Sequence, residues 1–118
     1  MTLEADLTAA LKAQCAQTFP DFAPAGTAVP WCTYQAIGGR ALRWLDGTAA
    51  DKRHTTVQVS IWTGSRLQTS ALIHAIEDAL SAATAFTARP VAESVSDADE
   101  ALGYYGATQD FEIYSQRT

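Results

Sequence analysis

The order of elements within residues 30–80 constrains the fold more than any other feature of this chain. Residues 53–62 alternate between apolar and polar side chains, which predicts a strand buried on one face. Residues 65–84 begin with a capping-box pattern and carry a broad apolar stripe at helical spacing, which predicts a helix. Residues 31–37 are rich in β-forming side chains and predict a further strand that ends at the glycine pair after it. The segment therefore reads as strand, loop, strand and helix.

The N-terminal part of the chain predicts a helix followed by an extended connector. Residues 2–17 carry apolar side chains at four-residue spacing, and Thr2 is placed to cap the helix. Residues 18–30 contain three prolines and a glycine, so we expect an extended connector with turns there. Phe19 and Phe22 are expected to attach this connector to the core.

The C-terminal part predicts two more strands. Residues 86–95 read as one weak strand, and its proline at position 90 indicates an edge strand or a bulge. Residues 96–100 read as an acidic turn, and residues 104–114 as the last strand. With neighbouring strands paired as hairpins, the expected fold is α+β. It is a mostly antiparallel four- or five-stranded sheet with two helices packed on one face, in the order α-β-β-α-β-β.

Length and composition are those of one globular domain, which we expect to span residues 1–118. Hydrophobic residues make up 47% of the chain and charged residues 18%, which suits a folded core. No apolar run is long enough to span a membrane, and the acidic N-terminus does not resemble a signal peptide. The net charge of −5 disfavours non-specific binding to nucleic acid.

The residue types that usually perform catalysis are scarce and scattered. His54 is expected to be solvated beside the basic residues that precede it, and His74 lies on the predicted central helix. Cys15 and Cys32 have no metal-ligand spacing, and we interpret them as buried reduced thiols, although the sequence leaves a disulfide open. There is no serine-elbow motif and no phosphate-binding glycine loop. We therefore expect no enzymatic activity, no cofactor and no metal site.

One cluster does suggest a binding surface. Four of the eight basic residues fall within residues 40–53, in a long loop between two predicted strands. Residues 41–45 within it could add a short strand. The cluster is rich in side chains that protein interfaces favour. We predict that it contacts a neighbouring subunit or an acidic partner, and the alternative is an ordinary hairpin with a half-buried tryptophan. The predicted interface residues are Arg40, Arg43, Trp44, Leu45, Lys52 and Arg53.

The ordered set of features resembles the small tail-completion and tail-terminator proteins of long-tailed bacteriophages and prophages. An N-terminal helix is followed by a proline-rich loop, and then by a proline-led strand at residues 29–35. A polar loop precedes the strand–aromatic–small residue–helix junction at residues 56–73. The final strand at residues 109–114 is similar to the terminal strand of that family. The resemblance covers nearly the whole chain, and the weak strand at residues 86–95 departs from it.

The resemblance implies structural work in a virion tail. Proteins of this kind assemble as homo-oligomeric rings, typically hexamers, on the end of the tail tube, and present a face for head–tail connector proteins. The implied partners are a second copy of the chain, the tail tube protein and the connector, and the implied site of assembly is the host cytoplasm. The competing interpretation is a small ligand-binding or peptide-binding α+β module, which would show a concave pocket lined by aromatic and polar groups.

Overall fold

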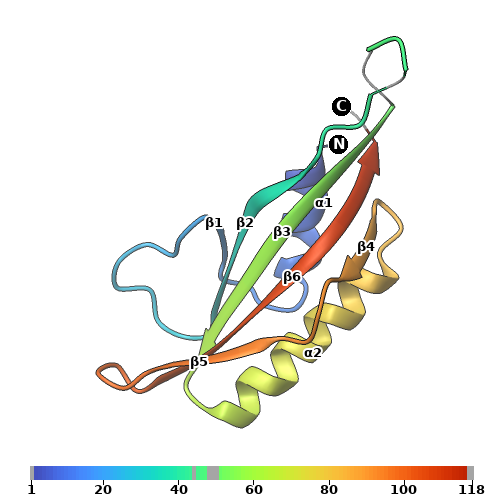
Figure 1. Ribbon diagram of the computed structural model, residues 1–118. Helices are drawn as coiled ribbons and strands as arrows, with labels where there is room; N and C mark the ends of the chain where they lie inside the picture. Colours follow the sequence, from blue (N-terminus) through green and yellow to red (C-terminus); the bar gives the residue numbers. More distant parts are fainter. Residues whose placement is uncertain (1, 44, 48–50, 117–118) are drawn as a thin grey trace.

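The computed structural model describes residues 2–43, 45–47 and 51–116. The chain forms two helices and one mixed sheet, with the arrangement shown in Figure 1. Its longest dimension is 53 Å, about twice the other two. In chain order the elements are α1 (Leu3–Lys12), β1 (Thr18–Pro20), β2 (Trp31–Arg40), β3 (Lys52–Thr63), α2 (Arg66–Ala82), β4 (Thr87–Pro90), β5 (Val95–Asp99) and β6 (Tyr104–Gln116).

Helix α1 begins where the sequence predicts and ends earlier. The Thr2 hydroxyl caps it by accepting a hydrogen bond from the Ala5 N–H at 3.2 Å, and Leu7 and Leu11 are buried. The prediction of a helix to residue 17 was too long. Thr18 starts β1 and its hydroxyl donates to the Cys15 carbonyl at 2.7 Å, so the chain has to leave the helix before the sheet begins.

Helix α2 follows β3 directly and confirms the predicted strand–helix junction. The Ser65 hydroxyl accepts a hydrogen bond from the Gln68 N–H at 3.1 Å, as the capping pattern requires. The face of α2 toward the sheet buries four residues: Thr69, Ile73, Ile76 and Leu80. Within the described part of the chain, no helix is long and apolar enough to cross a membrane.

The sheet follows the path β1-β2-β3-β6-β4, and β5 also pairs with β6. All pairs are antiparallel except β1 with β2, so the α+β class is correct, but the sheet is mixed and has six strands where a mostly antiparallel sheet of four or five was expected. The two helices and six strands follow the order α-β-β-β-α-β-β-β along the chain, instead of the expected α-β-β-α-β-β. Strands β3 and β6 form the centre and pair along twelve residues of β3.

Two predicted segments were wrong in detail, for the same reason. The connector at 18–30 contains β1, and the region 86–100 holds two short strands where one strand and a turn were expected. These strands pair with β2 or with successive stretches of the long β6, and backbone pairing requires no apolar pattern. Phe22 does not attach the connector to the core, because this residue is 75% exposed.

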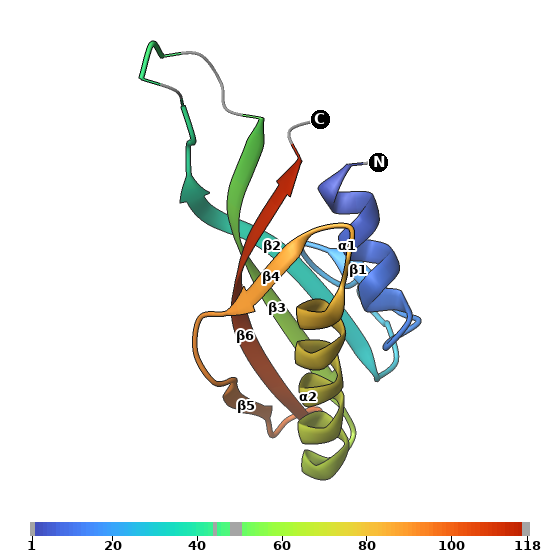
Figure 2. The same cartoon turned by 90° about the vertical axis from the view of Figure 1, so that its right-hand side faces the viewer.

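The core lies between the sheet and the two helices, which Figure 2 shows on the same side of the sheet. The alternation in β3 is as predicted: Val57, Val59 and Ile61 are buried toward the helices. Phe111 and Ile113 of β6 are fully buried on the same face. The opposite face of the central strands carries mostly half-buried polar side chains and is not covered by a helix.

Candidate functional site

Strands β2 and β3 continue past the packed helices and carry the segment that was predicted to bind. We call residues 40–53 the arm, and its described parts are 40–43, 45–47 and 51–53. Figures 1 and 2 show the arm extending from one end of the sheet, away from both helices. Between β2 and β3, the described residues form no additional strand over 41–45 apart from an isolated bridge at Arg43.

A β-bulge directs the arm away from the sheet. The register of β2 shifts between Ala36 and Gly38, and both following glycines have positive φ, 142° at Gly38 and 138° at Gly39. A Cβ atom on Gly39 would lie 2.3 Å from the His54 carbonyl oxygen, so only glycine fits there. The glycine pair therefore bends β2, and the prediction that it ends the strand was wrong.

His54 lies buried at the base of the arm, and the prediction that it is solvated was wrong. Its side chain lies against Tyr114, with ring centroids 4.8 Å apart, and the residue is only 9% exposed. Its Nδ1 accepts a hydrogen bond from the Arg40 N–H at 2.9 Å, and its Nε2 lies 3.8 Å from Glu112 Oε1. The strand period places His54 on one face with Thr56, but only the three-strand register brings Tyr114 over it.

The structure brings the described predicted residues together on the arm and exposes all of them. Arg40 ends β2, Lys52 and Arg53 begin β3, and Arg43 and Leu45 lie beyond the paired strands. Leu45 is fully exposed. The sixth predicted residue, Trp44, lies outside the described residues. The alternative of an ordinary hairpin with a half-buried tryptophan therefore stays a prediction.

The arm differs from the rest of the chain in charge. Its sequence contains four basic and two acidic residues, whereas the remainder contains four basic and eleven acidic residues. A surface of this kind attracts acidic partners, and its exposed charges favour orientation and rate of association over affinity.

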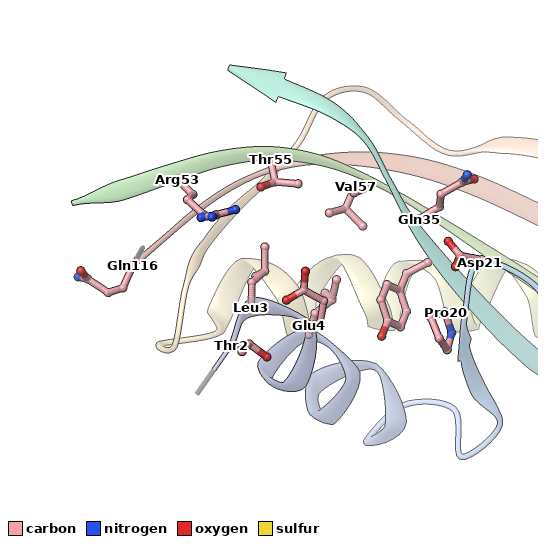
Figure 3. A pocket seen from close by; sticks show the side chains of 13 residues that line it. Thr2, Leu3, Glu4, Pro20, Asp21, Gln35, Arg53, Thr55, Val57 and Gln116 are labelled. Atoms are coloured by element: carbon pink, nitrogen blue, oxygen red, sulfur yellow. The ribbon is translucent and has the colours of Figure 1, made fainter. Parts of the chain in front are cut away.

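Arg53 also borders a cavity at the base of the arm. The cavity has a volume of about 490 Å³ and lies between the first turn of α1 and the helix-facing side of the sheet. In Figure 3, Arg53 from β3 and Glu4 from α1 both point into it, with Leu3 and Val57 forming its apolar side. The basic residues of the arm therefore do not share one face, because alternate residues of a strand point to opposite sides.

A second concave surface lies at the opposite end of the sheet, on the face that no helix covers. Trp31 and Trp62 face each other across β2 and β3, with ring centroids 6.1 Å apart. The Trp62 ring lies over Gly106, where a Cβ atom would approach it to 2.8 Å. The groove holds about 480 Å³, and its other lining residues include Asp21, Phe22, Asp99, Leu102 and Tyr104.

The sequence alone did not identify the groove, although one predicted strand begins at Trp31 and the next ends at Trp62. What it lacked was the register that pairs Trp31 with Trp62, and the closure of the groove by the loops at 21–27 and 99–104. Two of its lining residues, Phe22 and Leu102, are 75% and 63% exposed.

Among the described residues, neither the arm nor the lining of the groove contains a histidine or a cysteine. Within the described ranges, no three histidine, cysteine or acidic side chains gather as metal ligands. Cys15 and Cys32 are buried and free, and burial raises the pKa of the Cys32 thiol to about 12. A thiol with such a pKa remains protonated at neutral pH and is a poor nucleophile.

The chain matches a model of a known protein family. A family model described as tail completion protein gp17 matches residues 3–116, which includes both helices, all six strands and the arm. No curated protein matches the chain.

Proposed function

The chain belongs to the family of phage tail completion proteins and is a structural component of the tail, and we propose that it forms a ring that caps the tail tube and assists head–tail joining. The observation that carries this proposal is the arm, an exposed basic extension of an otherwise acidic domain that projects beyond the helix-covered core. The partners in this proposal are further copies of the chain, most simply in a hexamer, together with the tail tube and connector proteins. Assembly would take place in the host cytoplasm.

The shape of the molecule supports ring formation. A ring is built from heterologous contacts, in which one patch on a subunit meets a different patch on its neighbour. This chain presents two unlike surfaces near the ends of its 53 Å length, the arm and the groove. The uncovered sheet face and the helix face leave further surface for axial partners.

A second candidate function rests on the groove. A concave surface lined by two tryptophans, a tyrosine and two carboxylates has the composition of a small-ligand or peptide site. In that case the isolated protein would remain a monomer, and its tryptophan fluorescence would respond to the bound molecule.

The arm is tested by removing its central side chains. We expect Arg43→Ala combined with Trp44→Ala to leave the fold intact, because Arg43 is exposed, and to weaken self-association. The measurement is molar mass by light scattering over a range of protein concentrations, with circular dichroism as a check of folding. Arg89→Ala is the matched control, because it removes an exposed arginine from β4, outside the arm.

Two results would contradict the proposal. A chain that stays monomeric at every concentration would argue against a ring and favour the ligand-binding module. A ring that forms equally well with and without Arg43 and Trp44 would reject the role of the arm.

A further inference from the structure

We infer that the groove receives the arm of a neighbouring copy, so that each subunit contributes one arm and one acceptor. This inference rests on the proposed ring and specifies its side-to-side contact. The groove is defined by Trp31, Trp62 and Tyr104 at its floor and walls, with Phe22 and Leu102 at its edge.

Apolar complementarity is the first argument. Leu45 on the arm is fully exposed, and the groove offers exposed Phe22 and Leu102 beside the two tryptophans. Each of these side chains would lose apolar surface to water in the contact, which stabilises association by about 25 cal/mol per Å² before the costs of association. A volume of about 480 Å³ accommodates several side chains of that size.

Charge complementarity is the second argument. Asp21 and Asp99 line the groove, and Asp97 and Glu100 lie beside the latter in the sequence. The arm carries Arg40, Arg43 and Lys52 for this contact, because Arg53 points into the cavity beside α1 (Figure 3), and these three basic residues outnumber the arm's two acidic residues, Asp46 and Asp51. Opposite charges at the edge of an apolar contact steer the two surfaces into one orientation and disfavour contact between two arms or two grooves.

The positions of the two surfaces make the contact intermolecular. Figure 1 shows the arm at one end of the molecule and the turn between β5 and β6, which contains Leu102, at the other end. An arm therefore cannot fill the groove of its own chain. A contact between opposite ends of successive copies is heterologous, and it closes into a ring when the rotation per subunit divides a full turn.

Cysteine cross-linking tests the pairing directly. Leu45→Cys and Leu102→Cys are prepared as two differently tagged variants, mixed, and oxidised gently. The native Cys15 and Cys32 are buried and remain in place. We expect a disulfide-linked pair containing both tags, at least tenfold more abundant than in a control mixture of Leu45→Cys with Leu67→Cys. Leu67 is a suitable control because it is an 85% exposed leucine on α2, outside the groove.

Charge neutralisation tests the same contact without cysteines. Asp21→Asn and Asp99→Asn together remove both carboxylates. Asparagine tolerates the positive φ of 66° at Asp21 and can still accept the hydrogen bond that the Leu102 N–H donates to Asp99 Oδ1 at 3.2 Å. We expect self-association to weaken about fivefold to tenfold and to lose part of its salt dependence, because exposed ion pairs contribute modestly. The control, Asp78→Asn with Glu93→Gln, removes two exposed charges outside the groove.

The outcomes separate this inference from the proposed ring. Selective cross-linking together with weaker association of the neutralised groove supports the arm-and-groove contact. Oligomers that form without selective cross-linking, or that ignore the neutralised groove, would overturn this inference and leave the ring in place with another occupant for the groove. The absence of any oligomer and of any cross-link would overturn both.

Discussion

Strands β2 and β3 have two halves that are stabilised in different ways. Near the helices, Val59 and Ile61 are completely buried and belong to the single core. At the base of the arm, the same β3 exposes Lys52 and Arg53, which pair with β6, and a cavity separates this end of the strand from the first turn of α1. One half is stabilised by apolar burial, and the other by backbone pairing and a few specific contacts.

This difference separates stability from binding. Burial of apolar side chains supplies most of the free energy of folding, so the covered half determines whether the chain folds. None of the described arm residues belongs to the buried core, and we expect substitutions of its exposed side chains to leave the domain folded. Its own shape depends on Gly39 and His54, which join the two halves.

The largest expected effect on stability comes from a substitution in the covered half. Phe111→Ala should lower the free energy of unfolding by about 3–5 kcal/mol, because the side chain is fully buried and its removal leaves a cavity. Denaturant unfolding followed by fluorescence measures the change. Phe22→Ala, at a 75% exposed position, is the matched control and should change stability by less than about 0.5 kcal/mol. Similar losses for both variants would contradict the assignment of the core.

The next effect tests the junction between the halves. Gly39→Ala should cost about 2–4 kcal/mol, because its Cβ would collide with the His54 carbonyl in addition to the positive-φ strain. Gly38→Ala shares the strain, with a φ of 142°, but has no atom within 4 Å of the added Cβ. The difference between the two variants, measured by denaturant unfolding, isolates the close contact. Equal costs would show that strain alone acts at this bend.

A smaller effect is expected from the buried thiol in the covered half of β2. Burial raises the pKa of Cys32 from 9.0 to about 12, and the nearby Cys15 adds to the shift. Above pH 9 the unfolded chain loses the thiol proton while the folded chain keeps it. Unfolding therefore releases a proton, and the free energy of unfolding falls as pH rises toward 12. The slope from this group is at most about 1.4 kcal/mol per pH unit.

The alkaline loss is checked by denaturant unfolding between pH 8 and 11. Cys32→Ala removes the titrating group and should decline less steeply than the parent chain, while Arg43→Ala on the arm should follow the parent. A parallel decline for Cys32→Ala would show that other groups cause the alkaline loss.

Much of the fold was visible in the sequence where local pattern and tertiary environment agree. The alternation around Val57 and the capping serine before α2 each specify an element on their own, and both predictions were confirmed. The resemblance to phage tail-completion proteins likewise rested on the order of such elements. The match of residues 3–116 to that family confirms it. The short strands β1, β4 and β5 were missed or misread, because they exist by pairing with longer strands and carry little pattern of their own.

Of the candidate surfaces, the arm was visible in the sequence and the groove was not. The arm was predicted because its charge departs from that of the chain, which is a property of composition. The burial of His54 and the groove between Trp31 and Trp62 depend on partners from distant segments, Tyr114 in one case and the loops around Asp21 and Leu102 in the other.

The amino-acid sequence by itself determined the α+β class, the two helix starts, the central strand and the basic arm, because each follows from short-range periodicity, capping or charge. Only the tertiary structure decided the mixed sheet order, the bend at Gly39 and the aromatic groove. These features arise from strand register and from contacts between segments far apart in the chain, which no local pattern encodes.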